Sequence, residues 1–109
     1  MKIIEGIKKE KIYGIIREDD PEYSYEIARA YIEGGIKFIE LNSPLIVTKK
    51  VSKLDNVIVS QGGIITTAQA HSALESGAKI ISSPIFQTNL VRFASCYKAF
   101  LIPSTTTPN

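Results

Sequence analysis

The sequence has little of what marks several common classes of protein. Cys96 is the only cysteine among 109 residues, so an internal disulfide is excluded and the chain suits a reducing compartment. No run of about 18 apolar residues occurs, which argues against a membrane span. The net charge is +2 with both signs mixed along the chain, so the basic face that nucleic-acid binding needs is missing. These absences predict a cytoplasmic protein that binds neither membrane nor nucleic acid.

Groups that bind metals or nucleotides are also scarce. His71 is the only histidine, and no cysteine or carboxylate stands near it at metal-ligand spacing, so no protein-built metal site is predicted. The stretch at residues 61–63, Gln-Gly-Gly, lacks the spacing of a nucleotide-binding fingerprint. It indicates a tight turn whose backbone a ligand can approach closely. We therefore expect no metal and no cofactor.

What the chain does contain is a regular alternation of two kinds of segment. The predicted strands are apolar, β-branched runs at residues 11–17, 36–41, 57–61, 79–83 and 99–104. The predicted helices, several with capping residues, lie at residues 19–35, 44–54, 66–77 and 87–97, with a further helix near 1–9. Apolar strands that alternate with helices predict a parallel sheet. The pattern fits both a (β/α)8 barrel and a doubly wound sheet.

Polar residues collect where the predicted strands end. In parallel sheets of either kind, function gathers at the carboxyl ends of the strands. Here those ends carry one cation, one anion and many hydroxyl or amide groups: Arg17, Glu40, Asn42, Ser60, Gln61, Ser82, Ser83 and residues 104–107. The opposite ends carry lysines. The carboxyl-end rim is therefore suited to a small oxygenated anionic ligand.

Glu40 is the most informative of these residues. It follows Phe38 at the two-residue period of a strand, and Leu41 continues the apolar run. A carboxylate in such a setting needs a partner, and Arg17 on the first strand is the nearest candidate. A carboxylate held among apolar neighbours is useful for moving protons.

Three ordered segments carry a resemblance to a known family. They are GIIREDDPEYSYEIARAYIEGGIKFIEL, VIVSQGGIITTAQAHSALESGAKIISSP and LIPSTTTP. Their order and spacing resemble the first five strand–helix units of the 2-keto-3-deoxy-6-phosphogluconate and 4-hydroxy-2-oxoglutarate aldolases. The LNSP that follows Glu40 is similar to the branch acting on 2-keto-3-deoxy-6-phosphogalactonate.

The resemblance implies a fold, a reaction and a set of residues. The fold is a (β/α)8 TIM-type barrel, of which residues 1–109 form one incomplete domain of about five units. The reaction is that of a class I aldolase, which splits 2-keto-3-deoxy-6-phospho sugar acids into pyruvate and glyceraldehyde 3-phosphate. A lysine on the sixth strand forms the Schiff base, and Glu40 matches the glutamate that shuttles protons. The implied ligand-binding residues are Arg17, Asn42, Gln61, Gly62, Gly63, Ser83, Pro84 and Thr106.

The sequence also departs from the family pattern. Gly-Ala-Gly-Thr at the third strand is replaced by residues 60–63, Ser-Gln-Gly-Gly, so Gly63 stands where a threonine helps to hold the pyruvate carboxylate. The arginine that follows the glutamate is replaced by Asn42 or Pro44, depending on a gap. The Pro-Gly of the fifth strand is Pro103-Ser104. Residue 109 precedes the sixth strand, and no lysine here stands at a carboxyl strand end.

Two other functions remain open from the sequence. One is a non-catalytic module that binds a small anion or assembles with other chains on the same scaffold. The other is a self-contained domain of flavodoxin-like strand order. Because five strands of a barrel leave apolar edges open, the barrel interpretation also predicts a homo-oligomer.

Overall fold

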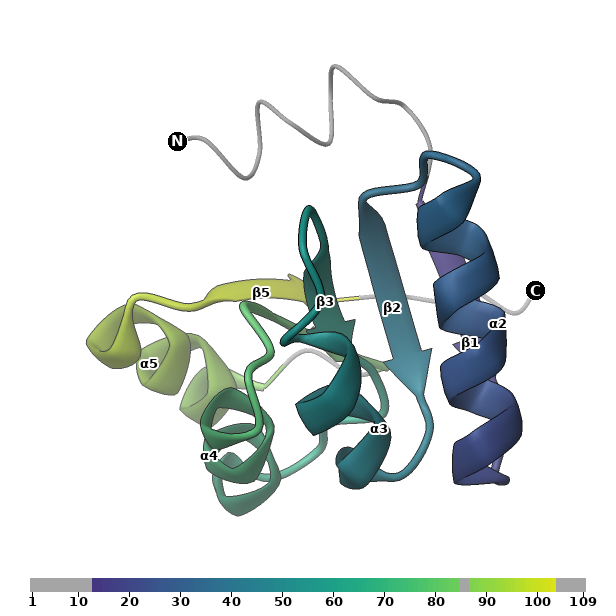
Figure 1. Ribbon diagram of the computed structural model, residues 1–109. Coiled ribbons are helices and arrows are strands. Elements are labelled where there is room, and N and C mark those ends of the chain that lie inside the picture. The colour runs from purple at the N-terminus through teal and green to yellow at the C-terminus, as the bar shows by residue number, and fades with distance from the viewer. Residues whose placement is uncertain (1–12, 85–86, 104–109) are drawn as a thin grey trace, which may run out of the picture.

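Strands and helices alternate along the chain as the sequence predicts. The computed structural model describes residues 13–84 and 87–103, so the helix expected near 1–9 and Thr106 lie outside it. The elements are β1 (Gly14–Arg17), α2 (Pro21–Glu33), β2 (Phe38–Asn42), α3 (Leu45–Val51), β3 (Ile58–Gln61), α4 (Thr67–Glu75), β4 (Ile80–Ser83), α5 (Thr88–Tyr97) and β5 (Phe100–Pro103) (Figure 1). Among the described helices, none is long and apolar enough to cross a bilayer.

The five strands form one parallel sheet in the order β1-β2-β3-β4-β5. Each strand therefore pairs with its neighbours in the chain. The flavodoxin-like order places β1 between β2 and β3, so that alternative is wrong. Consecutive parallel strands joined by helices are the arrangement found in a (β/α)8 barrel.

The helices pack on one face of the sheet through two apolar clusters. In the first, Ile39 and Leu41 of β2 meet Ala28 of α2 and Val47 and Val51 of α3. In the second, Ile81 of β4 meets Ala70 and Ala73 of α4 and Leu90 of α5. Because side chains alternate along a strand, the strand residues between these core residues point to the opposite face.

We call that opposite surface the inner face. Its strand residues, with Tyr13 just before β1, are Tyr13, Ile15, Arg17, Phe38, Glu40, Asn42, Ile58, Ser60, Ile80, Ser82, Phe100 and Ile102. In the middle of the sheet Phe38 and Ile80 are buried, whereas Ile15 on β1 is 47% exposed and Ile102 on β5 is 37% exposed. The most exposed apolar side chains of this face thus lie on the two edge strands.

Local capping fixes where the helices begin. The side chain of Asp20 accepts a hydrogen bond from the Glu22 amide at 3.1 Å, and Pro21 occupies the first turn of α2. At α4, Thr66 accepts from the Gln69 amide at 3.1 Å while the Gln69 side chain accepts from the Thr66 amide at 3.1 Å. This reciprocal pair is a capping box. It fixes the chain direction immediately after the β3 carboxyl end.

Replacing Thr66 by alanine should lower the free energy of unfolding by about 1 kcal/mol, because the α4 cap is lost. Urea unfolding followed by circular dichroism measures the change. Thr67→Ala is the matched control, since Thr67 is the first helical residue and alanine is well tolerated there. Equal losses in the two variants would contradict a capping role for Thr66.

Candidate active site

Glu40 is the middle residue of β2, and its carboxylate lies on the inner face beside Asn42, the last residue of the strand. It is half-buried, and Asn42, two residues along the same strand, donates from Nδ2 to Glu40 Oε2 at 2.9 Å. The two side chains are neighbours because residues i and i+2 of a strand share a face. The hydrogen bond fixes one carboxylate oxygen and turns the group toward the rim.

The sequence suggested Arg17 as the partner of Glu40, and this prediction is wrong. The register places Ile15 beside Glu40 and Arg17 beside Asn42, so the guanidinium group belongs one pair further toward the rim. Arg17 is exposed, and among residues 13–84 and 87–103 no ion pair links it to Glu40. The amide of Asn42 takes that place, and Arg17 stays available at the rim on the same face.

Gly62 makes this arrangement possible. A Cβ atom built on Gly62 would clash with Asn42 Oδ1 and would lie 2.8 Å from Glu40 Oε2. A side chain at this position would therefore push both polar groups away from β3. Gly63 has a different reason to be glycine, because its φ is +72°, in the left-handed region that other residues avoid.

Two hydroxyl groups lie deeper on the same face. Tyr13 Oη and Ser60 Oγ are both buried and, within the described part of the chain, have no hydrogen-bond partner. Burial raises the pKa of the Tyr13 phenol; the nearby Ser60 hydroxyl opposes this, and the Glu40 charge adds to the rise. Ser60 is thus close enough to influence the phenol although the two hydroxyls do not meet hydrogen-bond geometry. An unpaired buried hydroxyl costs about 1–3 kcal/mol.

Three other predicted site residues do not lie beside Glu40 on the inner face. Gln61 points to the helix side, where Thr48 Oγ1 donates to its Oε1 and its Nε2 donates to the Ser43 carbonyl oxygen at 3.2 Å. Ser83 is fully buried and shares the helix-facing side with Ile81. Pro84 is exposed just after β4. The structure therefore gathers Glu40, Asn42, Gly62 and Arg17, and turns Gln61 and Ser83 away.

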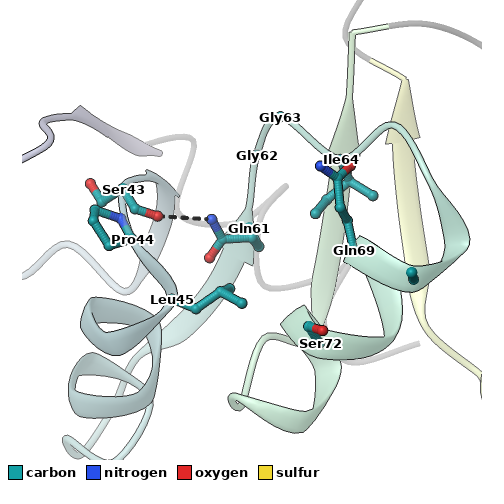
Figure 2. Close-up of a pocket in the computed structure, with 10 residues that line it drawn as sticks. Ser43, Pro44, Leu45, Gln61, Gly62, Gly63, Ile64, Gln69 and Ser72 are labelled. Atoms are coloured by element: carbon teal, nitrogen blue, oxygen red, sulfur yellow. Dashed lines mark hydrogen bonds between the residues drawn. The ribbon is translucent and has the colours of Figure 1, made fainter.

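A pocket of about 430 Å³ opens on the helix side of the β3 carboxyl end. Figure 2 shows it between the β2–α3 loop, the β3–α4 loop and α4, with Ser43 and Gln61 on one wall and Gln69 and Ser72 on the other. Gln61 and Gln69 are already engaged in hydrogen bonds, and no charged residue lines the pocket. Glu40 does not line it either, so the pocket and the carboxylate are separate features.

The inner face brings together groups that are suited to proton transfer. It combines a carboxylate, an amide that orients it and two buried hydroxyls. Among the described residues no group of three histidine, cysteine or acidic side chains could hold a metal ion. A carboxylate positioned in this way can take a proton from a bound hydroxyl and return it elsewhere.

Strand alternation, combined with the register between strands, reveals two residues that sequence reasoning did not assign to the site. Ser60 pairs in register with Glu40, so Ser60 rather than Gln61 shares its face. Tyr13 precedes Ile15 and Arg17 by two and four positions, which places it on that face as well. The signal is the two-residue period counted from Glu40 across to each neighbouring strand.

Comparisons with known proteins identify relatives of this chain. The family model described as KDPG and KHG aldolase matches residues 3–109. A curated relative, the 2-dehydro-3-deoxy-phosphogluconate aldolase of Treponema pallidum (strain Nichols), is 24% identical over 106 residues, covering 93% of this chain and 50% of the relative.

Solved structures show the same fold. The 2-keto-3-deoxy-6-phosphogluconate aldolase of Zymomonas mobilis ZM4 with 3-phosphoglycerate superposes with a TM-score of 0.77 at 24% identity, covering 88% of this chain and 48% of that one. KDPG aldolase from Legionella pneumophila, with pyruvate captured as a covalent carbinolamine, gives 0.75 at 23% identity, with 87% and 48% covered. The chain therefore spans about half the length of the relatives it matches, and the predicted barrel-type α/β fold is confirmed over that half.

Alanine at position 62 and alanine at position 63 should have different effects. Gly62→Ala should displace the Asn42 side chain from Glu40, because the new methyl group occupies its space, and should shift the Asn42 side-chain amide signals in NMR spectra. Gly63→Ala should leave those signals in place, since its Cβ would lie 3.6 Å from Asn42 Oδ1. It should instead lower the free energy of unfolding by about 1–2 kcal/mol through backbone strain. Unchanged Asn42 signals in Gly62→Ala would refute the role given to Gly62.

Proposed function

Because the chain belongs to the KDPG and KHG aldolase family, we propose that it carries the proton-transfer carboxylate of a class I aldolase. The substrates are 2-keto-3-deoxy-6-phospho sugar acids, and the products are pyruvate and glyceraldehyde 3-phosphate. The proposal treats residues 1–109 as one domain, which supplies five of the eight strand–helix units. A cytoplasmic location, suited to the single cysteine, belongs to the same proposal.

The observation that carries this proposal is the position of Glu40. Its carboxylate, on the middle residue of β2, meets the side chain of Asn42 at the carboxyl end of the strand, the end where barrel enzymes bind their substrates. It is half-buried and held by Asn42 at 2.9 Å. A side chain fixed in this way keeps one orientation toward a substrate above the sheet, as proton transfer requires.

The chemistry assigns Glu40 two successive proton transfers. A lysine amine condenses with the C2 ketone of the substrate, releases water and leaves an iminium ion that can accept electrons. Glu40 removes the proton of the C4 hydroxyl, the C3–C4 bond breaks toward the iminium, and the aldehyde leaves. Glu40 then returns its proton to C3 of the enamine, and hydrolysis releases pyruvate and the free lysine.

Groups at the rim are proposed to hold the anionic ends of the substrate. Arg17 is exposed beside Asn42 on the inner face, where its guanidinium group can bind a carboxylate by two hydrogen bonds. The backbone at Gly62 and Gly63 can approach the ligand closely, because neither residue has a side chain there. The relatives with bound pyruvate and 3-phosphoglycerate support ligands of this class. Gln61 and Ser83 are assigned no substrate contact, since both turn to the helix side.

Borohydride trapping tests the proposal. The natural coding region, expressed in full and incubated with pyruvate, should gain one covalent adduct when borohydride reduces the iminium. The 109-residue chain alone should gain none, because Lys37, Lys79 and Lys98 precede their strands rather than follow them. A missing adduct in the full product would reject the enzyme and favour the non-catalytic module.

Glu40→Gln in the full product should still form the adduct but should lower kcat for aldol cleavage by about 10²- to 10⁴-fold. Glu26→Gln, at an exposed position of α2, is the control and should leave the rate unchanged. Aldehyde release, followed in a coupled assay, gives the comparison. Equal rates in the Glu40 variant and the wild type would remove Glu40 from the mechanism.

The same interpretation predicts that the 109-residue chain self-associates. Ile15 and Ile102 expose apolar surface along the two edge strands of the sheet, and open edges invite pairing with a further strand. Light scattering at micromolar concentration should therefore give a mass above 12.0 kDa. Ile15→Lys should reduce the association, and Ile46→Lys on α3, where Ile46 is also 47% exposed, is the matched control. A cooperative monomer would contradict the prediction.

A further inference from the structure

The two buried hydroxyls beside Glu40 have no role in the chemistry described so far. Ser60 is completely buried, and neither its Oγ nor Tyr13 Oη has a hydrogen-bond partner within residues 13–84 and 87–103. Buried polar groups in folded proteins are nearly always paired, directly or through water. Two unpaired hydroxyls on one face, next to a carboxylate, therefore call for a common explanation.

The register brings these groups together. Ser60 on β3 is the direct neighbour of Glu40 on β2, and both point to the inner face. Tyr13 lies just before β1, on the other flank of β2, and its phenol is influenced by both Ser60 and Glu40. This influence indicates that the phenol reaches over β2 toward Ser60 and Glu40.

One oxygen of the Glu40 carboxylate remains able to accept a hydrogen bond from these hydroxyls. Asn42 donates to Oε2, and the same oxygen faces Gly62, as its 2.8 Å approach to a Cβ built there shows. The second oxygen, Oε1, accepts no hydrogen bond from another described residue and is therefore the acceptor that remains for the two hydroxyls. Each hydroxyl has one proton to donate and can also accept, so two hydroxyls and one carboxylate oxygen can form a complete chain.

We propose that Tyr13 and Ser60 are positioning residues for Glu40, whose hydroxyls form a buried hydrogen-bond chain that ends on its carboxylate, directly or through one bound water. Tyr13 donates to Ser60, and Ser60 donates to Oε1. Glu40 is then held from both sides, by Asn42 at the rim and by the hydroxyl chain from below. The role in catalysis rests on the function proposed above; the hydrogen-bond chain does not.

The test uses the folded 109-residue chain and needs no turnover. Glutamate labelled with 13C at Cδ gives one signal for each side chain, and Glu40→Gln identifies that of Glu40. Tyr13→Phe, which removes only the hydroxyl, should shift the Glu40 signal at neutral pH, and Ser60→Ala should do the same. Tyr23→Phe and Ser95→Ala are the matched controls at exposed positions and should leave it in place.

A second label follows the hydrogen-bond chain at its Tyr13 end. Tyrosine labelled with 13C at Cζ reports when each phenol ionises, and Tyr13→Phe identifies the signal of Tyr13. Glu40→Gln should lower the pKa of Tyr13, because a charge that favours the neutral phenol is removed. Ser60→Ala should also shift it, because the phenol loses the hydroxyl to which it donates.

The outcomes separate this proposal from the aldolase function. A Glu40 signal that does not respond to Tyr13→Phe, or a Tyr13 pKa that does not respond to Glu40→Gln, overturns the hydrogen-bond chain and leaves the borohydride result untouched. Conversely, a failed trapping experiment rejects the aldolase while the NMR shifts remain. If Tyr13→Phe does not fold, the response of the Glu40 signal to Ser60→Ala still decides the question.

Discussion

The hydrogen bond from Asn42 to Glu40 is the contact around which the inner face is organised. It requires that both residues share one face of β2 and that no side chain projects from Gly62 into their space. It also requires that β3 ends at Gln61 and is followed by a glycine turn, since further strand residues there would carry side chains. A carboxylate that would otherwise be half-buried without support thus acquires a fixed orientation from its own strand and from the neighbouring backbone.

The two faces of the sheet differ in the side chains that they carry. Isoleucine, leucine, valine and alanine side chains fill the space between strands and helices, and even Gln61 is used there, bound to Thr48 and to the Ser43 carbonyl. The inner face carries Glu40, Asn42 and Ser60, beside buried apolar side chains such as Phe38 and Ile80. Substitutions of these helix-side residues should therefore lower the free energy of unfolding more than substitutions of exposed polar residues such as Arg17.

The sequence predicts the elements of this fold better than the details of its site. Apolar runs and caps such as Asp20 and Thr66 locate strands and helices because their causes are local. The choice between Ser60 and Gln61 depends on which residue of β3 faces Glu40, and a shift of one residue reverses it. The pairing of Arg17 with Asn42 instead of Glu40 depends on the same register. Such relations are set by packing across strands, so no single segment contains them.

The sequential strand order has a consequence for how the sheet is built. Because every strand pairs with the one that precedes it in the chain, each new strand–helix unit meets an edge that is already formed. The loops to be closed are then short, which lowers the entropic barrier to folding and keeps contact order low for a parallel sheet. Such a sheet can grow from its amino-terminal edge while the chain is being synthesised. At each stage the last strand serves as the template for the next.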